Sequence, residues 1–81
     1  MAGVAAARLV TELEKLKTEM DAGRLKHGEY DQRLARIIGE LRDQGITADR
    51  PQLTAAIDDA AARGVIPPSV KAHLERKLGL A

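Results

Sequence analysis

The chain has 81 residues and a formal net charge of +1, with 13 basic and 12 acidic side chains. This balance argues against a general binder of polyanions, which usually carries a clear basic excess. No cysteine is present, which excludes a disulfide framework and any metal site built on thiolates. The length predicts one small domain, residues 1–81.

The apolar residues are mostly small. Alanine is the most frequent of them, phenylalanine and tryptophan are missing, and Tyr30 is the single aromatic residue. Alanine buries little surface, so each helix contact stabilises the fold less than a leucine-rich one would. Small domains with weak cores are often stabilised by association. The composition therefore predicts a homo-oligomer, with a dimer as the favoured state.

The first predicted helix covers about residues 4–22. Its apolar residues recur at spacings of three and four, a pattern typical of a seam that packs against another helix: Ala6, Leu9, Leu13, Leu16 and Met20. The second predicted helix covers about residues 28–44. Its stripe has the same spacing and is widened by one residue: Tyr30, Leu34, Ile37, Ile38 and Leu41. Within helices, Glu14 with Lys17 and Glu29 with Arg33 have the spacing of ion pairs.

Gly39 lies inside the second predicted helix, where glycine costs about 1 kcal/mol relative to alanine. Two interpretations stay open: a tolerated weakness, and a close crossing of two helices.

The third predicted helix covers about residues 50–63. Asp49 and Gln52 have the spacing of a capping box around Pro51, and Leu53, Ile57, Ala60 and Ala61 form the apolar face. The fourth predicted helix runs from Pro68 to about Leu78, with Val70 and Leu74 on its apolar face. Pro67 and Pro68 prevent the third helix from continuing through this point.

Four glycines follow predicted helices: Gly23, Gly45, Gly64 and Gly79. Glycine adopts the left-handed C-terminal cap without a Cβ penalty, and an apolar residue after it folds onto the last turn. The predicted fold is therefore all-α, with four short helices as two consecutive helical hairpins, about residues 4–45 and 46–81. Segments 20–25 and 61–66 are alike, which indicates either a duplicated hairpin or chance similarity between alanine-rich helices.

Residues 16–41 carry a more specific pattern. A leucine helix ends at residues 21–25 (DAGRL), an acidic–aromatic step follows at Glu29 and Tyr30, and Arg33 and Leu34 continue the seam. This pattern resembles the SHOCT-type helical hairpin, especially its actinobacterial variety. The resemblance implies a helical hairpin with a role in oligomerisation or protein contacts. No membrane segment of the kind often found beside the actinobacterial version occurs in these residues.

Residues 53–78 match the DNA-binding helix-turn-helix motif in part. The motif needs a small residue, a glycine four residues later, and apolar residues six and nine after the glycine. Ala60, Gly64 and Val70 fit, and His73 does not. The positions facing the DNA groove would include two prolines and a carboxylate, which read bases and phosphates poorly. A small DNA-binding regulator is therefore an alternative, with three phosphate-binding candidates: Lys71, Arg76 and Lys77.

The sequence predicts no catalytic residues, no metal site and no cofactor. His27 and His73 lie in different halves, and no further ligand stands at a suitable spacing. Ser69 is predicted to cap the fourth helix rather than to act as a nucleophile. Adjacent helical residues diverge by about 100°, so Asp58 and Asp59 do not suit a shared acid–base site.

The predicted function is a non-enzymatic protein–protein interaction module, such as an adaptor, regulator or inhibitor. The candidate anchors are Leu9, Val10, Leu13 and Leu16, and the charged neighbours Arg8, Glu12 and Lys15 would set orientation. The seam has a second interpretation, internal packing against the second helix. Both can hold at once, because residues 4–10 would overhang the shorter second helix and meet an outside partner. A structural part of a larger assembly is a further alternative.

The N-terminal run, residues 1–10, lacks the basic start and long apolar stretch of a signal peptide. No segment approaches the roughly 20 apolar residues of a membrane span. A cytoplasmic protein without a membrane partner is expected.

Overall fold

The computed structural model describes residues 4–44 and 50–80. These residues form four helices and no strand: α1 (Val4–Asp21), α2 (Glu29–Gln44), α3 (Arg50–Ala62) and α4 (Pro68–Lys77). The all-α fold is confirmed, and each predicted range agrees with its helix to within one residue at either end.

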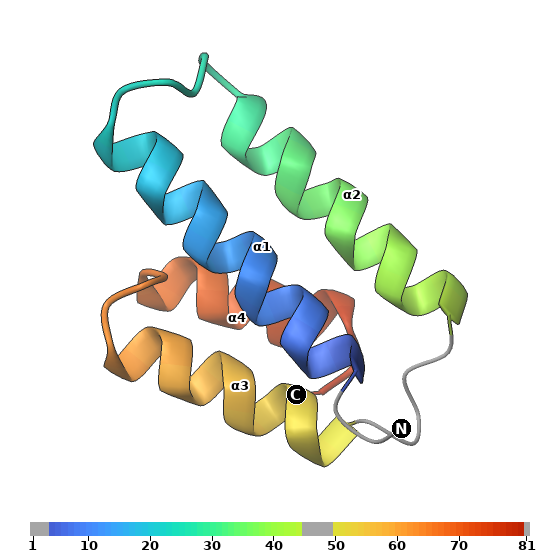
Figure 1. Ribbon diagram of the computed structural model, residues 1–81. Helices are drawn as coiled ribbons and strands as arrows, with labels where there is room; N and C mark the ends of the chain where they lie inside the picture. The colour runs from blue at the N-terminus through green and yellow to red at the C-terminus, as the bar shows by residue number, and fades with distance from the viewer. Residues whose placement is uncertain (1–3, 45–49, 81) are drawn as a thin grey trace.

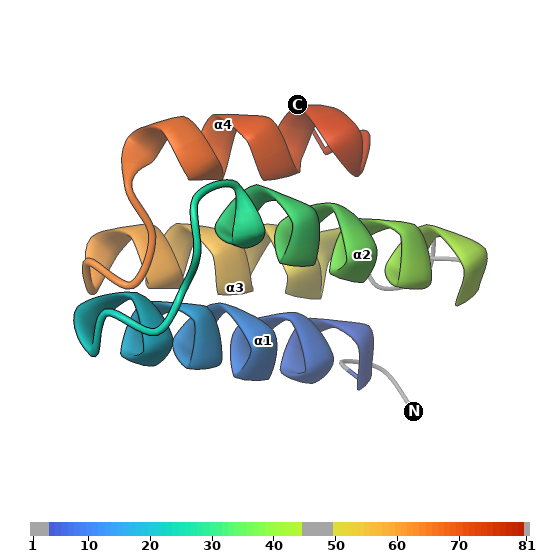
Figure 2. The ribbon, with the colours of Figure 1, turned by 90° about the horizontal axis from the view of Figure 1, so that it is seen from above.

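The four helices are arranged as two hairpins. Figures 1 and 2 show α1 antiparallel to α2 and α3 antiparallel to α4, so that α2 and α4 run in the same direction. Helix α1 packs against both α2 and α3, and α3 also packs against α4. Helix α1 therefore joins the two hairpins, while α2, packed on α1, and α4, packed on α3, come together on one side of the central α1–α3 pair.

The core follows the predicted seam of α1 closely. Leu9, Leu13 and Leu16 are fully buried, and the same core takes in Leu41 of α2 and Leu74 of α4. The seam is therefore internal, and it faces α3 as well as the predicted α2. Residues at the start of α1 do not overhang, because Ala5 and Ala6 are buried too.

Met20 was predicted to belong to this seam and does not. Its side chain is 51% exposed. A strict heptad repeat drifts by about 20° per seven residues around a straight helix, and Met20 stands two heptads beyond Ala6. The drift and the hairpin turn that follows remove Met20 from the core.

The glycine caps at Gly23 and Gly64 are confirmed. Their φ angles are 70° and 77°. After α1, the amide of Arg24 donates to the carbonyl of Glu19 at 2.9 Å; after α3, the amide of Val65 donates to the carbonyl of Ala60 at 2.8 Å. Both are Schellman motifs, and Gly79 repeats the geometry after α4. The predicted cap at Gly45 and the capping residue Asp49 lie outside the described residues.

The predicted cap at Ser69 is wrong. Pro67, in an extended conformation, is the N-cap of α4, and Pro68 occupies the first helical position. The carbonyl of Pro67 accepts from the amides of Val70 and Lys71, at 3.0 and 3.1 Å. The two prolines start the helix before Ser69, because proline's fixed φ suits the first turn.

The predicted pairs Glu14–Lys17 and Glu29–Arg33 are also wrong. Glu14 pairs with Arg63 of α3 at 3.3 Å, and Lys17 pairs with Asp21 at 3.0 Å. Glu29 instead accepts from the amide of Lys26 at 2.9 Å, which caps the start of α2. Same-helix spacing alone could not show that α3 brings Arg63 to Glu14, or that Glu29 caps its own helix.

Tyr30 lies half-buried against the core at the start of α2. Burial, and then the charge of Asp31, raises the pKa of Tyr30 above its ordinary value of 10.0. Burial of the neutral Tyr30 side chain therefore stabilises the fold fully below the pKa that Tyr30 has in the unfolded chain. This stabilisation is lost as pH rises through the pKa of Tyr30 in the folded chain. We expect the ultraviolet absorbance of tyrosinate to appear at higher pH in the native chain than in urea. Equal midpoints would contradict this packing.

Candidate functional site

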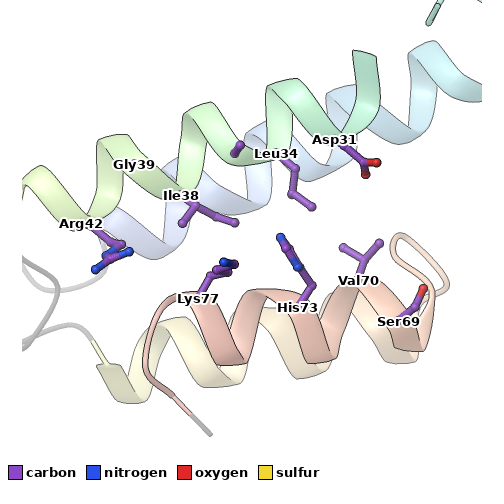
Figure 3. A pocket seen from close by; sticks show the side chains of 10 residues that line it. Asp31, Leu34, Ile38, Gly39, Arg42, Ser69, Val70, His73 and Lys77 are labelled. Atoms are coloured by element: carbon purple, nitrogen blue, oxygen red, sulfur yellow. The ribbon is translucent and has the colours of Figure 1, made fainter. Parts of the chain in front are cut away.

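A groove of about 650 Å³ lies between α2 and α4, where the two hairpins meet. Figure 3 shows side chains of both helices pointing into it from opposite sides. Six of the lining residues come from α2 and four from α4: Asp31, Leu34, Ala35, Ile38, Gly39, Arg42, Ser69, Val70, His73 and Lys77.

The floor of the groove is apolar because the stripe of α2 is wide. Ile37 lies beside α1, whereas Leu34 and Ile38 face α4. Leu34 and Ile38 are 2% and 5% exposed, and Val70 is half-buried. The floor of the groove is thus the outer layer of the core, and little of its large side chains is accessible to solvent.

Gly39 and Ala35 leave the α2 wall of the groove low. Both are exposed, and a Cβ added to Gly39 would meet nothing within 4 Å. A close helix crossing at Gly39 therefore does not occur within the described part of the chain. Another helix can approach the backbone of α2 here, because no side chain at Gly39 prevents it.

The two ends of the groove carry opposite charges. Asp31 lies at one end and Arg42 at the other, and Lys77 of α4 lies toward the Arg42 end (Figure 3). Asp31 stands in the first turn of α2 and Arg42 in its last turn. The acid therefore lies at the positive end of the helix dipole and the base at the negative end, which is favourable for both charges.

Asp31, Ser69 and His73 bring the residue types of a hydrolytic triad into one groove. A triad needs its members within hydrogen-bond reach of one another. Among the described residues no hydrogen bond joins any two of these three, and in Figure 3 the Ser69 hydroxyl lies away from His73. These three side chains therefore do not form a catalytic triad in this structure.

The predicted anchors on α1 need correction. Leu9, Leu13 and Leu16 have no exposed surface, so the folded chain cannot present them to a partner. Their burial follows from the central place of α1, which is covered by α2 on one side and α3 on the other. Val10 is half-buried beside them. The sequence pattern identified the seam correctly but not the number of helices that would cover it.

Arg8 and Glu12 form ion pairs with residues of the same chain. Arg8 donates to Glu12 at 2.7 Å and to Glu40 of α2 at 2.8 Å. Glu12, with 15% of its side chain exposed, also lies 3.9 Å from Arg33, which pairs with Glu19. Hydrogen bonds to Glu40 and then to Glu12 raise the pKa of Arg8. These ion pairs link α2 to α1.

The three basic residues of the DNA-binding alternative differ in whether the fold already pairs them. Lys71 pairs with Asp58 of α3 at 3.2 Å, while Arg76 and Lys77 are exposed. Helices α3 and α4 lie antiparallel in both views (Figures 1 and 2), whereas helix-turn-helix pairs cross steeply. The α3–α4 hairpin therefore lacks the steep helix crossing that presents a recognition helix to DNA.

His27 is exposed, and residues 4–44 and 50–80 contain no group of three possible metal ligands. Over the same residues, none of the helices has the length and apolar character needed to cross a membrane.

No protein-family model, curated protein or solved structure matches the chain. The resemblance of residues 16–41 to the SHOCT-type hairpin therefore stays a prediction.

Proposed function

We propose that the chain is a non-enzymatic protein-interaction module that binds an apolar helix face in the α2–α4 groove. The observation that supports this most is the groove itself, with its apolar floor and oppositely charged ends. Helix-in-groove recognition uses these two features, the floor for affinity and the ends for orientation.

A helix is the occupant that best suits the groove's shape. Two parallel helices form its walls, and the side chains of a third helix can pack into the furrow between them as ridges into grooves. The low wall at Ala35 and Gly39 allows the approach to be close. An adaptor or regulator role and a cytoplasmic location remain part of the proposal, since both were expected from the sequence.

Blocking the groove provides the test. Ala35→Arg places a long charged side chain in the groove from an exposed position on α2. We expect affinity capture with the tagged chain, from its native lysate treated with nuclease, to lose at least one protein that the unchanged chain retains.

Ala55→Arg is the matched control, because Ala55 is an exposed alanine on α3 that does not line the groove. This variant should keep the captured protein. Identical capture by all three chains would contradict a groove-based function. Loss of every captured protein on nuclease treatment would favour the DNA-binding alternative instead.

A further inference from the structure

We propose that the occupant of the groove is α2 of a second copy of this chain, lying antiparallel to α2 of the first. The inference rests on the proposed function, since it names the partner of the same groove. The resulting dimer has a twofold axis, so any contact made by one copy is made again by the other.

In this arrangement, each charged end of the groove in one copy meets the oppositely charged end of α2 in the other copy. An axis that passes between Arg36 and Ile37 sets Asp31 of each copy opposite Arg42 of the other. Helix α4 runs parallel to α2 (Figures 1 and 2), so it is antiparallel to the partner's α2. Lys77, which lies toward the Arg42 end of the groove, then adds a second cation near the incoming Asp31.

The same axis brings the low α2 walls of the two copies together. It sets Gly39 and Ala35, which are exposed, opposite Leu34 and Ile38, whose side chains are only 2% and 5% exposed and do not project from the fold. All six groove-lining residues of α2 are thus placed symmetrically about the axis, with acid opposite base at each end. A parallel second copy would set Asp31 against Asp31 and Arg42 against Arg42, which is repulsive.

The open space beside Gly39 fits this arrangement. The glycine costs helix stability, and nothing in the described part of its own chain occupies the space that a Cβ would take. In the dimer, α2 of the second copy lies against this space, so the glycine permits a closer approach of the two α2 helices.

Sedimentation equilibrium of the 81-residue chain at low salt tests the proposal. The unchanged chain is expected to form a dimer that weakens as salt screens the end charges. Asp31→Arg and Arg42→Asp are each expected to weaken dimerisation about tenfold, because each reversal turns two symmetric attractions into repulsions.

An equal mixture of the two variants is the decisive sample. A heterodimer of Asp31→Arg with Arg42→Asp sets opposite charges at positions 31 and 42 at both ends, so the mixture should associate more strongly than either variant alone. The double variant should also dimerise more strongly than either single variant, but less strongly than the unchanged chain, because the cation at position 31 then lies near Lys77. Asp43→Arg, which reverses an exposed acid on α2 outside the groove, should leave dimerisation unchanged.

Three results would overturn the proposal: a chain that stays monomeric up to millimolar concentration, assemblies larger than a dimer, or a mixture that fails to restore association. Misfolding cannot imitate the expected result, because two misfolded variants would not rescue each other. If the chain is monomeric but Ala35→Arg still loses a captured protein, the second copy is the wrong occupant and the groove function stands. If capture is also unchanged, both proposals fail.

Discussion

Replacing Leu13 by alanine should lower the free energy of unfolding by about 2–5 kcal/mol, the range found for leucine truncations in packed cores. Leu13 has no exposed surface, and it lies in the middle of the helix that contacts both neighbouring helices. Domains of this size have only about 4–12 kcal/mol of stability in total. The change should therefore appear as a large drop in the urea midpoint.

Leu13→Glu is expected to go further and unfold the chain, because a carboxylate without a partner would replace a buried methyl group. Loss of association with helicity retained would instead mean that the seam of α1 is an external surface. Circular dichroism and sedimentation of the same sample separate these results.

Met20→Ala is the control for Leu13→Ala, since it also truncates a large apolar side chain on α1. With half of Met20 exposed, its truncation should cost less than about 1 kcal/mol. Equal losses for the two variants would contradict the position of α1 in the core.

Replacing Gly64 by alanine should destabilise the chain by about 1 kcal/mol. Gly64 has a φ angle of 77°, and an L-residue in the left-handed region costs roughly 1–2 kcal/mol. Restricting the unfolded chain recovers part of this cost. Urea denaturation measures the difference, and the chain should be dilute because association adds to apparent stability.

The same substitution at Gly39 should have the opposite sign. Gly39 has ordinary helical geometry and open space around it, so Gly39→Ala should stabilise the isolated chain by about 0.5–1 kcal/mol. Destabilisation of the dilute chain by Gly39→Ala would mean that α2 crosses another part of the same chain closely at this point.

The elements were predictable because local signals determined them. Glycines after three of the four helices terminate them through local hydrogen bonds, and Pro67 and Pro68 start α4 without help from distant residues. The spacing of Leu9, Leu13 and Leu16 likewise identified the buried face of α1. In each case the physical cause lies within a few residues of its effect.

The functional surface was not predictable in the same way. The groove exists because α2 and α4, from different hairpins, pack on different members of the central pair. No spacing within one helix shows which apolar face stays partly uncovered. The strongest seam in the sequence, on α1, predicts an interface most clearly, yet it is the one that the chain itself buries. The isolated Gly39 was the available signal, and its two interpretations could not be separated without the structure.

Arg33 illustrates the same limit for charges. Its same-helix neighbour Glu29 was the predicted partner, whereas the folded chain pairs it with Glu19 of α1. Glu19 lies 14 residues earlier in the sequence. Only the hairpin turn brings the two side chains together.

The central claim is that the chain associates through the α2–α4 groove. Heteronuclear amide NMR spectra over a dilution series test it most directly, because each backbone amide reports its own surroundings. We expect concentration-dependent shifts at Ala35 and Gly39 of α2 and His73 of α4, with Thr11 of α1 and Ala55 of α3 unchanged. Shifts concentrated on α1 and α3, with the groove residues unchanged, would contradict the account.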